Sequence, residues 1–248
     1  MAERYFDGTF YKRTKLISYS DTNTKLEAFL HVLLSGFSEI AGDEAVANEQ
    51  TYEFYFDYGV CFLISRMSAR IHRCPHRDET VTFTTWFRKV EDDRFYLRDC
   101  EVRAEDGELL VSMSGTWVLL DVKTRSMLGV KDYPGVHSKA FPEKRADAPE
   151  CKKVIAPENS QMLGERPVYY TDLDINSHIN NAVYTRIATD FLPEEYREKK
   201  TREYVINFKR ETLLGQVLQL RGGAIDNRYV IEGYVDDELH FACEFTFE

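Results

Sequence analysis

The side chains best suited to chemistry lie in residues 172–181, where acidic, amide and imidazole groups crowd together before a predicted helix. Asp174, Asn176 and His178 alternate with other residues, so an extended backbone would place these three side chains on one face. A carboxylate, an amide and an imidazole on one face could orient a substrate and transfer protons. We therefore expect a functional site here.

A simpler interpretation is that the segment only caps the helix that follows it. Asn and Asp are common immediately before helices, and Asn180 and Asn181 would suit that role. Capping, however, needs one side chain, and this segment offers several. The matching place in the first half of the chain carries Asn23, Lys25 and Glu27 instead, although a purely structural role would favour similar residues twice.

The spacing of apolar residues predicts two helices and two sets of strands. The first helix is expected to begin near a possible capping box, Thr24 and Glu27, and to continue to about Ile40. The second is expected from about Asn181 to Leu192. Strands are expected at 8–19, 61–73, 79–90, 94–104 and 109–121, and again at 166–170, 202–209, 216–224, 229–235 and 240–247.

The two halves of the chain look like copies of one unit. Residues 68–74 match 205–211, residues 106–109 match 236–239, and Asp21 matches Asp172. The expected fold class is α+β, a tandem double hot-dog in which each antiparallel sheet wraps around a central helix. The expected domains are 1–130 and 160–248, joined by a linker at 131–159 that is rich in proline and charge.

Composition excludes several classes of protein. The 248 residues carry a net charge of −10, which argues against non-specific nucleic-acid binding, and no apolar run approaches the ~20 residues of a membrane span. The beginning of the chain lacks the apolar core of a signal peptide, and the five scattered cysteines suggest neither disulfides nor zinc. We expect a cytoplasmic protein without metal or cofactor.

A second motif, Phe208-Lys209-Arg210-Glu211, completes a resemblance to a known family. With Asp-Leu-Asp-x-Asn-x-His-x-Asn-Asn-x-x-Tyr at 172–184, and with Thr85-Trp86 and residues 117–121 in the first half, the chain resembles the acyl-acyl carrier protein thioesterases. That resemblance implies hydrolysis of fatty acyl-acyl carrier protein in fatty acid biosynthesis. It also implies that Asp174, Asn176, His178 and Glu211 are catalytic. Many plant members have Cys where Thr212 stands here, so a Cys nucleophile is unavailable.

The preferred mechanism is attack of water on the thioester carbonyl, with Glu211 as general base. His178 could donate to the developing oxyanion or share the proton transfer, while Asn176 would orient the substrate or water and Asp174 would hold the Asn-His geometry. Backbone amides near Asn180 and Asn181 would stabilise the oxyanion. A mixed-anhydride route, with Glu211 as nucleophile, remains open at this stage.

The acyl chain is expected to bind in the first half, which has the more apolar helix. The expected binding residues are Phe29, Leu33, Phe37, Met67, Trp86 and Trp117. The partner would be an acidic acyl carrier protein, docking on Lys152-Lys153 or on the basic cluster at 197–202. The chain could pair as a homodimer. An acyl-CoA thioesterase or hydratase and a non-catalytic acyl-binding protein are the alternative functions.

Overall fold

The computed structural model describes residues 3–248, which divide into two units of strands and helices. The first unit comprises Met1–Ser65 and His72–Ala148, and the second comprises Arg66–Ile71 and Pro149–Glu248. The segment 131–159, expected to be a linker, is thus divided between the units after Ala148. The first two residues of the expected domain 1–130 lie outside the described residues.

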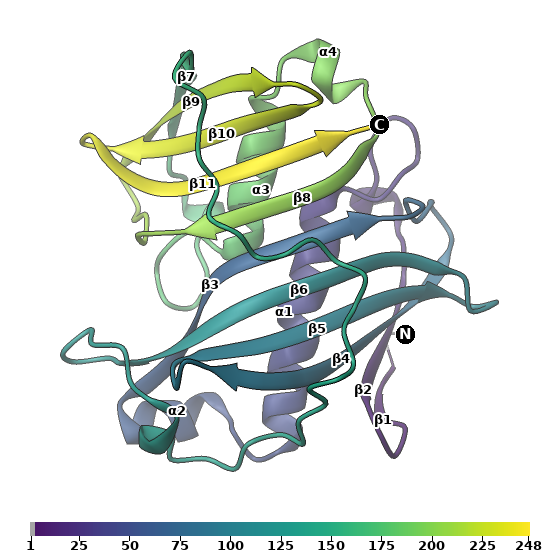
Figure 1. The fold of residues 1–248 in the computed structure, drawn as a ribbon, viewed down its shortest axis with the longest axis vertical. Helices are drawn as coiled ribbons and strands as arrows, with labels where there is room; N and C mark the ends of the chain where they lie inside the picture. Colours follow the sequence, from purple (N-terminus) through teal and green to yellow (C-terminus); the bar gives the residue numbers. More distant parts are fainter. Residues whose placement is uncertain (1–2) are drawn as a thin grey trace. The chain divides into compact units, whose positions relative to one another are not determined.

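The first unit is an antiparallel sheet with one long helix (Figure 1). Its strands have the order β1-β2-β4-β5-β6-β3. The elements are β1 (Arg4–Phe6), β2 (Tyr11–Leu16), α1 (Leu30–Ala47), α2 (Tyr52–Tyr58), β3 (Val60–Ile71), β4 (Thr80–Glu91), β5 (Phe95–Ala104) and β6 (Leu109–Asp121), with single 3₁₀ turns at Tyr19–Asp21 and Val130–Asp132.

The second unit repeats this layout with a shorter helix. Its strands have the order β3-β8-β11-β10-β9-β7, in which the Arg66–Ile71 part of β3 contributes. The elements are β7 (Gln161–Pro167), a 3₁₀ turn (Tyr170–Asp172), α3 (Asn181–Asp190), α4 (Glu194–Arg197), β8 (Thr201–Phe208), β9 (Val217–Ile225), β10 (Arg228–Val235) and β11 (Glu238–Phe247). The expected strands are confirmed to within a few residues, with two exceptions. Residues 8–19 contain only β2 and part of the preceding turn, and in place of the strand expected at 166–170 the structure has β7, which ends at Pro167.

Each helix packs its apolar side on its own sheet. In the first unit Leu33, Leu34 and Phe37 of α1 are buried, and a Cβ at Gly36 would lie 2.5 Å from the ring of Phe83 on β4. Only glycine allows the helix to approach the sheet so closely. This arrangement confirms the expected α+β hot-dog unit.

In the second unit α3 makes the corresponding contact through an aromatic side chain. The ring of Tyr184 lies 5.1 Å from that of Phe241 on β11 and 5.8 Å from that of Phe208 on β8. Figure 1 shows α3 running across one face of β8, β11 and β10. The side of α3 that faces the sheet therefore also faces the strand ends that carry the second motif.

The expected start of the first helix is wrong. The side-chain oxygen of Asn23 accepts hydrogen bonds from the amides of Lys25 and Glu27, and Leu26 has a φ of 62°. These contacts make residues 23–27 a tight turn, so Thr24 and Glu27 do not form a capping box and α1 begins only at Leu30. An Asx-type turn competes with the helix for the same backbone amides.

A buried carboxylate closes the corresponding loop of the second unit. Asp172 accepts hydrogen bonds from the amide of Tyr169 and from the guanidinium groups of Arg166 and Arg186, and its carbonyl accepts from the amide of Asn180. Burial acts to raise the pKa of Asp172, but the hydrogen bonds from Arg166 and Tyr169 and the two positive charges outweigh it and lower the pKa. Asp172 thus ties β7, α3 and the loop between them together.

We predict that Asp172→Asn lowers the free energy of unfolding by about 2–4 kcal/mol at neutral pH, because two arginines lose their carboxylate partner. Since the folded pKa is lowered, this stabilisation is present above the unfolded pKa of about 4 and disappears as the pH falls through the folded value. Urea unfolding at several pH values measures it. The exposed Asp57→Asn is the control, and equal effects of the two variants would contradict the role of Asp172.

Candidate functional site

The loop before α3 is a turn, so the expectation of an extended backbone at residues 174–178 is wrong. The Asp174 amide donates to the His178 carbonyl at 3.0 Å, and Ser177 has a φ of 64°. The carboxylate of Asp174 also accepts from the amide of Asn176 at 2.8 Å. The side chains of Asp174 and His178 are therefore brought together by a tight turn and not by strand alternation.

The imidazole of His178 lies between two carboxylates. Its Nδ1 is 3.7 Å from Asp174 Oδ1, and its Nε2 is 3.7 Å from Glu211 Oε1. The side chains of His178, Asp174 and Glu211 are 15%, 20% and 28% exposed, so solvent reaches all three. A base, an imidazole and a second carboxylate within contact distance can move a proton and orient the ring that carries it.

Main-chain hydrogen bonds hold His178 beside Glu211, although the two residues are far apart in the sequence. The amide of Ile179 donates to the carbonyl of Thr212 at 2.9 Å, and His178 forms an isolated antiparallel bridge with Leu213. Ile179 follows His178, and Thr212 follows Glu211. The hydrogen bond between Ile179 and Thr212 therefore places the side chains of His178 and Glu211 next to each other.

The two asparagines at the helix start differ in role. Asn180 is the N-cap of α3, and its side-chain oxygen accepts from the amide of Ala182 at 2.9 Å, so this side chain has a structural contact. The amide of Asn180 donates to the carbonyl of Asp172, and the amide of Val183 donates to the carbonyl of Asn180. Asn181 is the first residue of the helix, and its amide is the one in this turn best suited to an external acceptor. The side chain of Asn176 is exposed.

Three buried polar residues lie next to Glu211, and their contacts with one another were not predicted from the sequence. The hydroxyl of Tyr184 donates to Thr212 Oγ1 at 2.9 Å, and Thr212 Oγ1 lies 2.7 Å from Nδ1 of His240. Burial raises the pKa of Tyr184 to about 12, helped by the negative charge of Glu211, and burial followed by the charge of Arg210 lowers that of His240. The sequence did carry a signal for Tyr184 and His240, because each is a polar residue at a position where the pattern of its helix or strand predicts an apolar one.

The first unit contains the same scaffold with different side chains. Its loop amide of Ala28 donates to the carbonyl of Pro75 at 2.8 Å, and the residues before these two are Glu27 and Cys74. Burial, and after it the charge of Glu27, raises the pKa of the Cys74 thiol to about 12. Glu27 stands at the place of His178 and forms an isolated bridge with His76, and the thiol is protonated, so the first unit does not repeat the Asp174–His178–Glu211 arrangement of the second.

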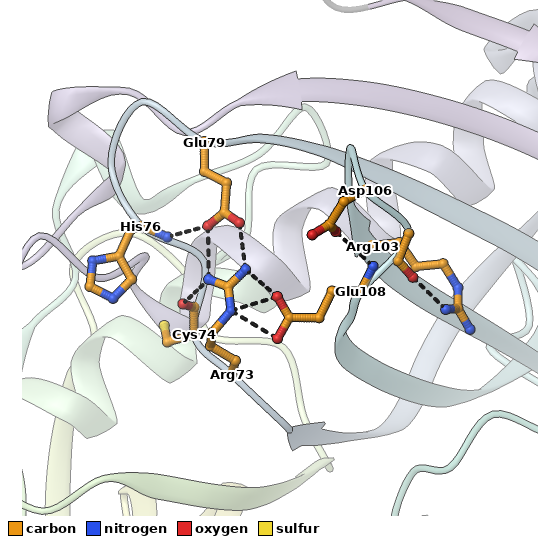
Figure 2. A network of polar contacts seen from close by, with 8 residues as sticks. Arg73, Cys74, His76, Glu79, Arg103, Asp106 and Glu108 are labelled. Atoms are coloured by element: carbon orange, nitrogen blue, oxygen red, sulfur yellow. Dashed lines mark hydrogen bonds and ion pairs between the residues drawn. The ribbon is translucent and has the colours of Figure 1, made fainter.

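The arginine beside this place is engaged in ion pairs. Figure 2 shows the Arg73 guanidinium between Glu79 and Glu108, at 2.6 Å and 2.8 Å, with Cys74 beside it. The second unit keeps one of these pairs, Arg210 with Glu238 at 3.1 Å, and has an uncharged residue, Gln216, at the place of Glu79. Arg210 is therefore less constrained than Arg73.

The residues expected to bind an acyl chain belong to both units. Phe37 packs edge-on against Trp117 at 5.3 Å inside the first unit, and Leu33 is also buried there. Phe29 is the N-cap of α1 and stacks on His31, and Met67 belongs to the second unit, which corrects its expected place in the first. Trp86 alone of the six lines a pocket of about 430 Å³ in the first unit. Other residues lining this pocket are Phe10, Tyr11, Phe87, His137 and Phe141.

The described residues contain neither a cluster of metal ligands nor a membrane-spanning helix. Among residues 3–248, no group of three or more His, Cys, Asp or Glu side chains is arranged to hold a metal ion. In the same part of the chain, none of the helices has the length and hydrophobicity of a membrane span.

Comparison with known proteins gives consistent matches over both units. Residues 8–133 match the acyl-ACP thioesterase N-terminal domain, and residues 156–238 match the acyl-ACP thioesterase C-terminal domain. Among curated proteins, oleoyl-acyl carrier protein thioesterase 2 of Arabidopsis thaliana is 26% identical over 165 residues, 60% of this chain and 44% of the relative. The match therefore spans less than half the length of that relative.

Two solved structures resemble the chain over nearly its full length. An acyl-ACP thioesterase from Bacteroides thetaiotaomicron covers 98% of this chain and 99% of its own, with a TM-score of 0.87 and 18% identity. The 12:0-ACP thioesterase from Umbellularia californica has the same coverage, with a TM-score of 0.80 and 15% identity. At such identities the structures support the fold. Because the two domain matches cover most of its length, the chain belongs to the acyl-ACP thioesterase family.

Proposed function

We propose that this protein hydrolyses the thioester of fatty acyl-acyl carrier protein and releases the free fatty acid. The observation that carries the proposal is the His178 imidazole held between the carboxylates of Asp174 and Glu211 in a member of this family. The reaction needs a base for water, a group that donates to the carbonyl oxygen, and a means of orienting both. The fatty acid would serve fatty acid biosynthesis in the cytoplasm.

In this mechanism Glu211 accepts a proton from water as the water oxygen attacks the thioester carbon. His178 donates to the carbonyl oxygen as it gains negative charge, and Asp174 holds the ring through Nδ1. Asn176 orients the substrate, and the Asn181 amide adds a hydrogen bond at the positive end of α3. Collapse of the tetrahedral intermediate breaks the carbon–sulfur bond, and the leaving thiolate takes the proton that Glu211 accepted from water, which restores the Glu211 carboxylate.

Thr212 does not suit the role of nucleophile, although its hydroxyl lies next to an imidazole. The Thr212 side chain is buried, and its oxygen is already in contact with Tyr184 on one side and His240 on the other. Solvent does not reach this oxygen, so a substrate could not reach it for attack either. Water, which can approach the partly exposed Glu211, is the better candidate.

We predict that Glu211→Gln lowers kcat for acyl-acyl carrier protein roughly 10²–10⁴-fold, because the amide cannot accept the proton of water. Binding of an unreactive thioether analogue should persist. Glu195→Gln, at an exposed residue of the same unit, is the control and should retain full activity. Wild-type turnover by Glu211→Gln would remove Glu211 from the mechanism. A covalent acyl group on Glu211 in quenched wild-type enzyme would favour the mixed-anhydride route.

For docking of the carrier protein we favour the basic surface around Lys153. The pKa of Lys209 is lowered by desolvation and then by the positive charges of Arg66 and Lys153, so these three cations lie near one another. Both candidate clusters contain an ion pair, since Lys152 lies 2.8 Å from Glu244 and Arg202 lies 3.8 Å from Glu248, so the preference rests on the three cations around Lys153. Neighbouring cations without a strong carboxylate partner attract an acidic protein.

We predict that Lys153→Glu lowers kcat/KM for acyl-acyl carrier protein roughly 5- to 30-fold, as expected for a loss of 1–2 kcal/mol. Lys200→Glu, in the other cluster, is the matched control and should have the smaller effect. Raising the salt concentration should weaken the wild-type reaction and the difference between the variants. Equal effects of both variants would contradict this docking site. Higher activity on acyl-CoA than on the carrier-protein ester would instead favour an acyl-CoA thioesterase.

The acyl chain is proposed to bind in the first unit, in the pocket that Trp86 lines. Its volume of about 430 Å³ lies within the range of small-molecule sites, and aromatic rings form much of its surface. Leu33 and Phe37 are so fully buried that an acyl chain could reach them only by displacing core side chains. Of the expected acyl-binding residues, we therefore favour Trp86.

A fatty acid with a photoreactive group at its methyl end should label peptides containing Phe10, Trp86 or Phe141 after irradiation. Excess unmodified fatty acid should suppress this labelling, since both would compete for one pocket. Peptide mass spectrometry identifies the labelled positions. Label on Phe37 or Trp117 would contradict the pocket and return the acyl site to the interior beside α1.

A further inference from the structure

We propose that Tyr184, Thr212 and His240 form a buried polar chain that positions Glu211 for hydrolysis. The inference rests on the proposed function, and none of the three residues is needed to contact the substrate. Tyr184 comes from α3, Thr212 from the segment after β8, and His240 from β11. Together they connect the helix that carries the oxyanion-binding amide with β11 and with the segment after β8 that carries the base.

Three hydrogen-bonding contacts hold Thr212 in place. Its hydroxyl contacts Tyr184 at 2.9 Å and His240 at 2.7 Å, and its carbonyl accepts from Ile179 at 2.9 Å. The His240 carbonyl in turn accepts from Arg210, the residue before Glu211, at 3.2 Å. Glu211 therefore lies between two residues whose positions are each set by His240. Such buried polar contacts are short and well defined, and they restrict motion more than apolar packing does.

His240 reaches this place because of a β-bulge. The register of β10 with β11 shifts between Gly233 and Tyr234, which face Phe241 and Leu239, so His240 between them has no direct partner. A bulge turns the extra residue's side chain away from the regular alternation. The ring also forms a hydrogen bond with the main chain of Glu211, which acts to raise its pKa against the larger effect of burial.

The first unit shows that the scaffold does not require these polar groups. At the offsets that relate the two loops, helices and bulges, the residues corresponding to Tyr184, Thr212 and His240 are Leu33, Pro75 and Leu110. All three are buried.

The backbone contacts of the two units are nevertheless the same. Leu110 also occupies a bulge, and its carbonyl accepts from the amide of Arg73 at 3.2 Å, as that of His240 does from Arg210. A purely apolar set therefore supports the same loop, bulge and helix contacts in the unit that lacks the imidazole–carboxylate pair. Buried polar residues carry a desolvation cost that the apolar set avoids. Because the polar set occurs in the unit with Glu211 and an apolar set replaces it in the other unit, we infer that it has a role in the reaction.

Four variants test this role: Tyr184→Phe, Thr212→Val, His240→Leu and Thr212→Ser. We predict that the first three lower kcat roughly 10- to 100-fold with little change in KM, because Glu211 loses its fixed position. Thr212→Ser keeps the hydroxyl and should restore most of the activity. The double variant Tyr184→Phe/Thr212→Val should be no worse than Thr212→Val alone, because both changes break the same chain.

The second unit also contains a matched control. The hydroxyls of Thr185 and Tyr204 are 3.0 Å apart, and both side chains are fully buried. Thr185→Val and Tyr204→Phe remove a hydrogen bond of the same kind and should lower the free energy of unfolding by a similar amount. They should leave kcat unchanged. If the control variants lose as much kcat as the variants of Tyr184, Thr212 and His240, the three residues have only a structural role and the proposal is overturned.

A readout that does not depend on turnover separates this proposal from the proposed function. In wild-type protein the ring NMR signals of His178 report the neighbouring Glu211 carboxylate. These signals should move in Thr212→Val and stay in place in Thr185→Val. If the wild type fails to hydrolyse acyl-acyl carrier protein but the signals move as expected, only the function is wrong. Unchanged His178 signals and wild-type kcat in Thr212→Val would overturn the positioning role itself.

Discussion

The candidate active site depends on the main-chain hydrogen bond from the amide of Ile179 to the carbonyl of Thr212. This bond joins the loop before α3 to the segment after β8, so that the preceding residues, His178 and Glu211, face each other at 3.7 Å. The buried Asp172 carboxylate closes the loop from one side, and the side-chain contacts of Thr212 hold the other segment. The proposed chemistry depends on the loop before α3 and the segment after β8 keeping these relative positions.

The first unit makes the corresponding bond between Ala28 and Pro75, yet it carries Glu27 and Cys74 at the functional places. The two units therefore share a scaffold and differ in what the scaffold presents. Around the first site the supporting side chains are apolar and Arg73 is held by two carboxylates. Around the second they are polar and buried, an arrangement that costs desolvation free energy and restricts movement of a base.

Local patterns in the sequence predicted most of the elements and failed at their ends. Strand alternation predicted β3–β6 and β8–β11, because each strand has one face on the core. The capping box at Thr24 and Glu27 failed because Asn23 binds the amides that a helix would use. The extended form of residues 174–178 failed for the same reason, since Asp174 closes a turn. In both cases a short polar side chain outweighed the pattern of the residues around it.

The sequence by itself determined the repeated order of helix and strands and the kinds of side chain available for hydrolysis. These follow from local spacing, because apolar periodicity records which face of each element is buried. Only the tertiary structure decided that Glu211 contacts His178, that a bulge turns His240 toward Thr212, and that Trp86 lines a pocket which Phe37 does not reach. Such contacts join residues far apart in the chain, and their distances depend on packing and register that no local pattern encodes.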